Sequence, residues 1–337
     1  MYSFSFCLFN SLANGLRPAP PSSADFVKSL NSSGGNLSIS IVSKYLFNKY
    51  YNLSNIISLI LFIISIFFLT FKGLNYGVDF KGGTLIELRS DNTNYKTEDI
   101  RGAFNKLNLD DLSVKKFGAE GDYVIKFKRP DLNEPDFIKN LKNNLDNYLE
   151  DYSFRRVENV GPKVSAELLQ DGVTAIAIAL AAMLIYIWFR FEWQFSIGAI
   201  VAIFHDVIIT LGIFSLLSLE INLSIVAAVL TIVGYSMNDT VVIFDRVREN
   251  LKKYADIKIF DLTNLSINET LSRTLITSVT TLLALLSIFF FGGEILKGFS
   301  FAMILGVILG TYSSIFIANP VLVYFKVSQK TLIKEED

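Results

Sequence analysis

Six apolar runs, each close to the length of a membrane-spanning helix, constrain the fold of this chain more than any other feature. A helix needs about 20 apolar residues to cross roughly 30 Å of hydrocarbon. The runs occupy residues 53–71, 173–189, 195–217, 221–244, 274–291 and 299–325. Hydrophobic residues make up 51% of the sequence and its mean hydropathy is +0.41, as in proteins whose main solvent is lipid. We predict a polytopic α-helical membrane protein with six transmembrane helices.

The charged and reactive residues exclude several classes of function. With 31 basic and 32 acidic residues the net charge is −1, so no general field attracts nucleic acid, and we predict no nucleic-acid partner. Cys7 is the only cysteine and His205 the only histidine, which argues against a disulfide and against Cys- or His-rich metal sites. That histidine lies inside a span beside no suitable serine, so a hydrolytic triad fails too. We predict no cofactor, no metal and no enzymatic activity.

The residues between the first two runs predict one small α+β domain, which we place at 73–172. Alternating patterns predict strands at 84–89, 123–128 and 152–160, with a weaker strand at 114–117. Helical spacing, with good starts at Thr97 and Pro135, predicts helices at 97–107 and 134–149. The order strand, helix, strand, strand, helix, strand is typical of a ferredoxin-like fold.

Basic residues set the expected orientation in the membrane. The segment 245–273 contains six Lys or Arg residues, whereas the loops near Glu220 and at 292–298 contain only Lys297. Cytoplasmic loops carry the excess of Lys and Arg, so we expect both termini to be cytoplasmic and the 73–172 domain to be external, or periplasmic.

The remaining divisions of the chain follow from these assignments. The first helix with its flank is 44–72, a five-helix bundle with the cytoplasmic loop 245–273 fills 173–325, and 326–337 is a cytoplasmic tail. Residues 1–43 are rich in Ser, Asn, Gly and Pro and lack the features of a signal peptide, so we expect a disordered tail or a wrongly assigned start.

Two aspartates inside the predicted spans are the main indication of function. An ionised Asp at the centre of a spanning helix costs roughly 2.5–3.5 kcal/mol, so such residues normally face the bundle interior and are functional. At 1.5 Å per residue, Asp206 lies about 16 Å and Asp239 about 12 Å from the cytoplasmic ends of their spans. The two carboxylates therefore occupy similar depths.

A polar stripe leads from the cytoplasmic end toward Asp239. Arg246 lies seven residues after Asp239 on the same helical face, and Asn238 and Asp245 have the same spacing on a neighbouring face. A carboxyl group placed between desolvating lipid and a guanidinium group can take up and release a proton. We therefore predict a proton relay made of Asp206, Asp239, Arg246, Asn238 and His205.

A structural interpretation of the same residues stays open. Asn238, Asp239 and Arg246 can cap and pair at an interhelical contact near the interface, and His205 can be a hydrogen-bonded neighbour of Asp206. Small residues recur every four positions in the last span and predict close helix packing within the bundle, with a subunit interface as the alternative; they are Ala302, Gly306, Gly310 and Ser314.

Two glycine-containing segments flank the predicted external domain. Gly82 and Gly83 permit a tight turn into its first strand, and the rest of a phosphate-binding loop is missing there. Residues 160–165, with Gly161 and Pro162, predict a hinge between the sheet and the second span.

Several motifs together resemble one known family. They are Val78-Asp79-Phe80-Lys81-Gly82-Gly83, Val160-Gly161-Pro162, His205-Asp206-Val207, Gly234-Tyr235-Ser236 with Asn238-Asp239, and Asp245-Arg246-Val247-Arg248-Glu249-Asn250. Over residues 44–325 the chain resembles the smaller, SecF, subunits of the SecD/SecF family, in the resistance-nodulation-division superfamily.

The resemblance implies a function and a set of partners. It implies six spans with one external domain in the bacterial inner membrane, association with SecD and with the SecY/SecE/SecG channel, and contact with translocating unfolded polypeptide. It also implies use of the proton motive force to assist late stages of Sec-dependent protein export. We hypothesise that protonation of Asp206 shifts the third and fourth spans and that 160–165 passes the shift to the external domain.

Two other functions remain possible interpretations of the sequence. One half of a proton-coupled lipid or drug exporter would use similar spans and acids, although such exporters normally carry larger external domains and twelve spans. A passive scaffold for the channel predicts instead that replacing Asp206, Asp239 and Arg246 leaves function intact.

Overall fold

The structure is a computed structural model that describes residues 45–91, 95–107, 109–116, 118, 120–128, 136–254, 257–329 and 331. All of these residues belong to one compact unit, residues 43–337. The predicted tail at 1–43 lies outside the described residues, as does most of 326–337.

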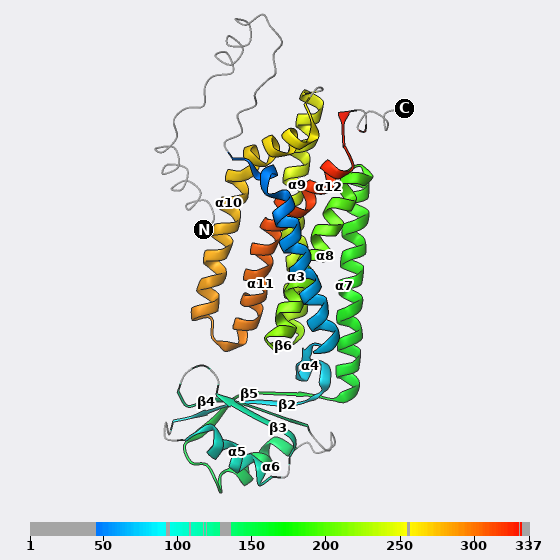
Figure 1. Ribbon diagram of the computed structural model, residues 1–337. Helices are drawn as coiled ribbons and strands as arrows, with labels where there is room; N and C mark the ends of the chain where they lie inside the picture. Colours follow the sequence, from blue (N-terminus) through cyan, green and yellow to red (C-terminus); the bar gives the residue numbers. More distant parts are fainter. Residues whose placement is uncertain are drawn as a thin grey trace, which may run out of the picture. The chain divides into compact units, whose positions relative to one another are not determined.

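Six of the described helices are long and apolar enough to cross a membrane, which confirms the predicted spans (Figure 1). The first five are α3 (Tyr51–Phe71), α7 (Pro162–Arg190), α8 (Trp193–Leu216), α9 (Leu223–Lys253) and α10 (Ile259–Phe291). The sixth span begins as α11 (Glu294–Ser313), continues through the π-helical segment Ser314–Ala318 and ends as α12 (Asn319–Tyr324). A 3₁₀ turn, Phe47–Tyr50, precedes α3.

Two predicted boundaries differ from the structure because helices extend beyond the apolar runs. Helix α7 starts at Pro162, so residues 162–172 belong to the second span and not to the sheet domain; Pro is favoured in the first turn of a helix. The predicted loop 245–273 shrinks to the few residues between α9 and α10. Polar contacts join these two helix extensions, among them the hydrogen bond of 2.7 Å from Asn250 Nδ2 to Glu269 Oε2.

The domain after the first span has the predicted ferredoxin-like topology. Its strands are β2 (Gly83–Ser90), β3 (Asp110–Lys116), β4 (Asp122–Lys128) and β5 (Tyr152–Val160), and its helices are α5 (Thr97–Asn105) and α6 (Phe137–Leu145). The antiparallel sheet has the order β3-β4-β2-β5, and both helices cover one face of it (Figure 1). Buried side chains such as Ile86, Phe104 and Ile125 form the core between the helices and that face.

The predicted second strand, 114–117, is longer than expected and begins at Asp110. Its predicted last residue, Phe117, lies outside the described residues, as does the expected helix start at Pro135.

A short connection joins the end of the first span to the sheet. Strand β1 (Asn75–Tyr76) pairs in parallel with β6 (Glu220–Ile221), and α4 (Val78–Lys81) follows it. Gly82 and Gly83 have positive φ angles of 75° and 129°, and a Cβ on Gly83 would lie 2.8 Å from the Phe127 carbonyl oxygen. This confirms the tight turn into β2, which side chains other than glycine would strain.

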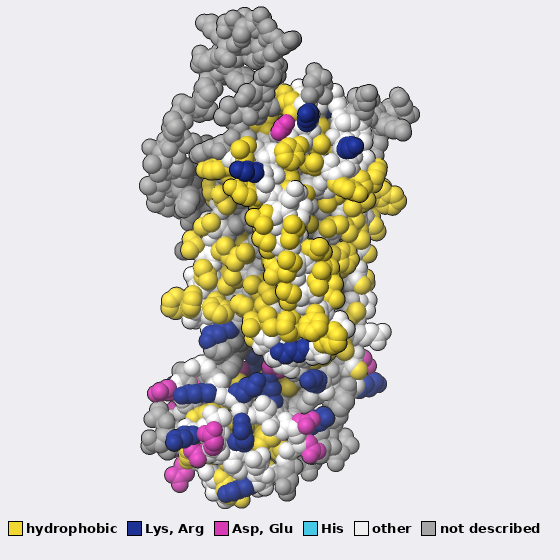
Figure 2. Space-filling view, viewed as in Figure 1, with side chains coloured by type: hydrophobic (Ala, Val, Ile, Leu, Met, Phe, Trp, Pro, Cys, Tyr) yellow, Lys and Arg dark blue, Asp and Glu magenta, His cyan; other side chains and the backbone are white. Residues whose placement is uncertain are grey.

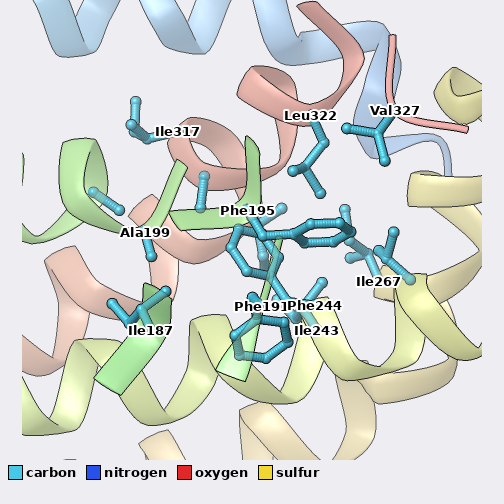
Figure 3. Packing of buried hydrophobic residues seen from close by; sticks show 14 of the residues in the cluster. Ile187, Phe191, Phe195, Ala199, Ile243, Phe244, Ile267, Ile317, Leu322 and Val327 are labelled. Atoms are coloured by element: carbon cyan, nitrogen blue, oxygen red, sulfur yellow. The ribbon is translucent and has the colours of Figure 1, made fainter. Parts of the chain in front are cut away.

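Aromatic side chains pack the end of the bundle opposite the sheet domain. Phe191 follows α7, Phe195 is on α8 and Phe244 is on α9, and Figure 3 shows their rings gathered together. The ring centroids of Phe195 and Phe244 are 5.2 Å apart in an edge-to-face arrangement. Such pairs hold the α7–α8 turn against α9.

Candidate functional site

Asp206 lies where α8, α9 and α11 meet, fully removed from solvent at 0% exposure. Two serine hydroxyls donate to its Oδ2 atom: Ser236 Oγ of α9 at 2.6 Å and Ser313 Oγ of α11 at 2.7 Å. His205 Nδ1 lies 2.9 Å from its other carboxyl oxygen, Oδ1. These three contacts supply the hydrogen bonds that a buried carboxylate requires.

His205 connects the Asp206 site to Tyr312 and, through Tyr312, to α3, the first span. Its ring stacks on Tyr312 with centroids 6.3 Å apart. The Tyr312 hydroxyl donates to the Ser54 carbonyl oxygen at 2.9 Å, and lies 2.8 Å from Ser58 Oγ on α3. The Nε2 atom of His205 is buried and hydrogen-bonds to no described residue.

The contact between His205 and Asp206 can hold a proton in either of two positions. When Asp206 is a carboxylate, the Nδ1–H of the imidazole donates to Oδ1. When Asp206 is protonated on Oδ1, that hydroxyl can donate to an unprotonated Nδ1. A proton can therefore be held on either partner without breaking the hydrogen bond between them.

Small residues of α11 allow these helices to approach closely. A Cβ on Gly310 would lie 3.0 Å from the Ser236 Cβ, and a Cβ on Gly306 would overlap the side chain of Ile232. Ala302 and Ser314 are fully buried as well. The repeat of small residues thus packs within the bundle, which confirms the first of the two predictions made for it.

Asp239 has weaker hydrogen-bond donors than Asp206, although its side chain is only 2% exposed. The hydroxyl of Thr311 on α11 approaches its Oδ2 at 3.5 Å, at the long limit for a hydrogen bond. That hydroxyl also lies 2.7 Å from Ser278 Oγ and 2.8 Å from the Val307 carbonyl oxygen, which compete for it. Arg273 on α10 is a cation whose charge acts on Asp239.

The two acids share α11 as a common neighbour. Thr311 contacts Asp239 and Ser313 contacts Asp206, and these two hydroxyl residues are two positions apart. Among the described residues, no hydrogen bond joins Asp206 directly to Asp239. The structure therefore brings the predicted acids to the same helix, at separate sites.

Two predicted relay residues lie away from the acids. Asn238 is exposed on the surface of α9. Arg246 forms ion pairs of 2.6 Å with Glu249 and Glu269, and its backbone lies two helical turns, roughly 10 Å, beyond Asp239 along α9. Among the described residues its ion pairs thus join α9 to α10, and none joins it to Asp239.

The motif residues outside the acid sites connect the elements. Asp79 Oδ2 accepts from the Leu223 backbone N–H at 3.0 Å, at the start of α9, and Phe80 is buried against the same end of the bundle. Asp245 pairs with Arg190 at 2.6 Å.

The remaining motif residues lie on or beside α7. Gly161 is the single residue between β5 and α7, and Pro162 is the first residue of that helix. Gly234 packs near Met183 of α7. The predicted hinge is therefore a one-residue connection.

The hydroxyl groups that approach the two aspartates were not predicted from the sequence, and neither were the roles of Arg273 and Glu269. Ser236 belongs to a quoted motif, but its hydroxyl had no assigned role there. Ser and Thr are common in spanning helices and often bond to their own backbone, so sequence alone gives no signal for Thr311 or Ser313. Among the residues that the structure describes, no group of three or more His, Cys, Asp or Glu side chains could hold a metal ion.

Comparison with known proteins identifies the family. Residues 140–328 match the family described as protein export membrane protein SecD/SecF, C-terminal, and residues 67–93 match the SecD/SecF GG motif. The chain belongs to the SecD/SecF family. With its six apolar helices, it is a multi-pass inner-membrane protein of that family and a relative of protein translocase subunits.

Relatives within the SecD/SecF family match most of the chain. The protein translocase subunit SecF of Rickettsia bellii (strain OSU 85-389) is 44% identical over 283 residues, covering 83% of this chain and 92% of that protein. SecF of Cereibacter sphaeroides is 42% identical over 266 residues, covering 76% and 82%.

A solved structure of the family has the same fold. The crystal structure of SecDF from Thermus thermophilus, described as a translocon-associated membrane protein, superposes with a TM-score of 0.76 at 34% identity. The match covers 84% of this chain and 38% of the SecDF chain. The present chain therefore spans well under half the length of that protein.

Proposed function

We propose that the chain is a SecF-like subunit that uses the proton motive force to assist late stages of Sec-dependent protein export across the bacterial inner membrane. Its proposed partners are SecD, which supplies the part of the SecDF chain that is missing here, and the SecY/SecE/SecG channel. The family membership and the translocon association reported for SecDF support these partners. The proposed orientation places both termini in the cytoplasm and the sheet domain in the periplasm, next to emerging polypeptide.

The observation that carries the proton coupling is the unequal environment of the two buried aspartates. Asp206 has three contacts of 2.6–2.9 Å, whereas the two hydroxyls that act on Asp239, Thr311 at 3.5 Å and Ser278, also hydrogen-bond to each other at 2.7 Å. A buried carboxylate with few donors gains most from protonation. Asp239 is therefore the proposed group that exchanges protons, with Arg273 as its counter-charge, and Asp206 with His205 is the second position of the relay.

The energy available sets a limit on each step. One charge that crosses 100 mV releases about 2.3 kcal/mol, which is enough to bias two arrangements of a helix bundle but too little for a large rearrangement. Repeated cycles are therefore part of the proposal.

Two connections are suited to pass a helix movement to the sheet domain. The β5 strand continues into α7 through Gly161 alone, and Asp79 binds the first turn of α9. A shift of α7 or α9 would in this way move the start of β2 and the end of β5, which pair with each other where the sheet meets the bundle.

The test is export of a preprotein into inverted membrane vesicles that contain SecD and the channel, with ATP supplied, in the presence and absence of a proton gradient. We expect Asp239→Asn to remove the gradient-stimulated part of export and Asp206→Asn to reduce it strongly. Asp261→Asn is the matched control, because Asp261 is an exposed acid at the start of α10. Protein abundance is matched by immunoblotting.

Full gradient stimulation in both variants would refute the proton coupling. The chain would then be a passive scaffold of the channel, and the donors around Asp206 would serve packing alone.

A further inference from the structure

A cavity of about 710 Å³ lies between the uncovered face of the sheet and the adjoining end of the bundle. The sheet contributes side chains of β2, β3, β4 and β5 that point away from α5 and α6, such as Leu85, Lys115 and Val124. The bundle contributes the last turn of α8 through Phe214 and the first turn of α9 through Ile225. No step of the proposed proton relay uses this cavity.

Six basic and five acidic side chains line the cavity, a net surplus of one positive charge. The basic residues are Lys81, Lys115, Lys116, Lys126, Lys128 and Arg156, and the acidic residues are Asp79, Glu87, Asp111, Glu158 and Glu220. Every one of these acids has a partner. Lys126 pairs with Glu220, Lys128 with Asp111 at 2.9 Å, and Arg156 with Glu158 and, at 3.6 Å, with Glu87, while Asp79 binds the α9 backbone.

Three lysines are left over after this pairing. Lys81, Lys115 and Lys116 make no ion pair with any described residue, and each is exposed. Figure 2 shows basic side chains gathered where the apolar surface of the bundle meets the sheet domain. The cavity can therefore accept an anion without breaking an existing ion pair.

The position of the cavity indicates which anion fits. Among its apolar residues, Phe214, Leu219 and Ile225 lie at the ends of membrane spans, whereas Leu85 and Val124 line the sheet side together with the lysines. A phospholipid presents the same order, with apolar glycerol esters toward the membrane and a charged phosphate beyond them. An extended polypeptide binds a sheet mainly by adding to an edge strand, whereas this cavity opens on the face of the sheet.

We propose that this cavity binds the phosphate-bearing headgroup of an anionic phospholipid, such as phosphatidylglycerol, from the leaflet on the sheet-domain side. The unpaired lysines hold the phosphate, and Leu219, the half-buried apolar residue that follows α8, contacts the glycerol region. A bound lipid would connect the sheet domain to the membrane surface independently of the protein contacts between them.

The test measures lipid binding to the delipidated full chain by native mass spectrometry, with phosphatidylglycerol and phosphatidylcholine titrated separately. The cavity variant is the double substitution Lys81→Gln and Lys115→Gln. The control is the double substitution Lys139→Gln and Lys142→Gln on α6, which removes the same charge from the opposite face of the sheet. All forms are first matched for thermal unfolding temperature.

We expect the wild type and the control to bind phosphatidylglycerol equally and in preference to phosphatidylcholine. Each lysine near an anionic lipid contributes about fivefold in affinity, so the cavity variant should bind phosphatidylglycerol roughly 25-fold more weakly. Wild-type binding should also weaken at high salt, because the contacts are charged and partly exposed.

Equal binding of phosphatidylglycerol to the cavity variant and the control would overturn the proposal, as would equal affinity of the wild type for the two lipids. Binding of free glycerol phosphate at the same concentrations would identify a simple anion site instead. Lysine-dependent binding of an unfolded acidic polypeptide, with no binding of the lipid, would assign the cavity to polypeptide and refute the lipid site.

Discussion

The two buried aspartates differ in how completely the fold satisfies them. Asp206 receives contacts from α8, α9 and α11, and its neighbour His205 stacks on Tyr312. Asp239 is almost as buried, yet its contact to Thr311 is long and shared. Two equally buried acids can therefore differ in how strongly the fold stabilises their charged forms. The supply of hydrogen-bond donors sets this difference, and the proposed proton exchange at Asp239 depends on it.

Removal of each carboxyl group should give the largest difference in stability between the two aspartate sites. Asp206→Ala leaves the two serine donors and the imidazole without their acceptor, so we expect the free energy of unfolding to fall by about 2–4 kcal/mol. Asp239→Ala should cost less, about 1 kcal/mol, because the hydroxyls of Thr311 and Ser278 keep their hydrogen bond to each other and Arg273 is exposed to solvent. Unfolding of the purified proteins in detergent measures both, and equal losses would show that donor supply does not distinguish the sites.

A steric change can disturb one site and leave the other intact. Gly310→Ala places a methyl group 3.0 Å from the Ser236 Cβ, which must move the donor away from Asp206, at a cost of about 1–3 kcal/mol. Gly234→Ala is the control, since the nearest described atom lies at 3.9 Å, on Met183. We expect the unfolding temperature to fall only in the first variant; a similar fall in both would mean that the contact between Gly310 and Ser236 is not the cause.

Removal of one hydroxyl group at a time tests the donors of the two aspartates separately. Ser313→Ala removes a 2.7 Å hydrogen bond to a charged group and should cost about 1–2 kcal/mol. Thr311→Val keeps the shape of its side chain and loses a 3.5 Å contact to Asp239 together with neutral hydrogen bonds to Ser278 and the Val307 carbonyl oxygen, so the cost should stay near or below about 1 kcal/mol. The denaturant midpoint is the measurement, and a larger loss in Thr311→Val would reverse the assignment of the two acids.

The smallest effect is expected for Arg246→Gln. Its ion pairs with Glu249 and Glu269 are partly exposed, so stability should change by less than about 1 kcal/mol, and neither acid site should respond. Gradient-driven export in vesicles should stay near the wild-type level. A loss as large as that of Asp239→Asn would restore Arg246 as the functional partner of that acid.

Much of the fold was predictable because periodicity and length decide it. Apolar runs fixed the six spans, and alternating strands with two helical patterns fixed the ferredoxin-like order, since each pattern must bury one face. Helix ends were less predictable. Residues 162–172 and the segments around Arg246 and Glu269 are polar helices, whose extent depends on caps and on contacts with neighbouring helices.

The candidate site was predictable only in its acids. Asp206 and Asp239 stand out because a carboxyl group in a span has a high cost. Their partners depend on which helices are neighbours and how they are rotated, as with Ser313, which lies 107 residues from Asp206. The ion pair of Arg246 with Glu269 was unpredictable for the same reason, because helical spacing shows what lies along one helix and not which residue of α10 is nearby.

The π-helical segment Ser314–Ala318 starts directly after Ser313, and the Asn319 amide binds the Ser314 carbonyl oxygen at 2.6 Å. A π turn contains one more residue than an α turn, so its loss would rotate the preceding part of the helix by about 100° relative to α12. Such a rotation would take Ser313 off Asp206 and Thr311 off Asp239 together. A change of one residue in the last span would therefore alter the hydrogen-bond donors of both acids at once.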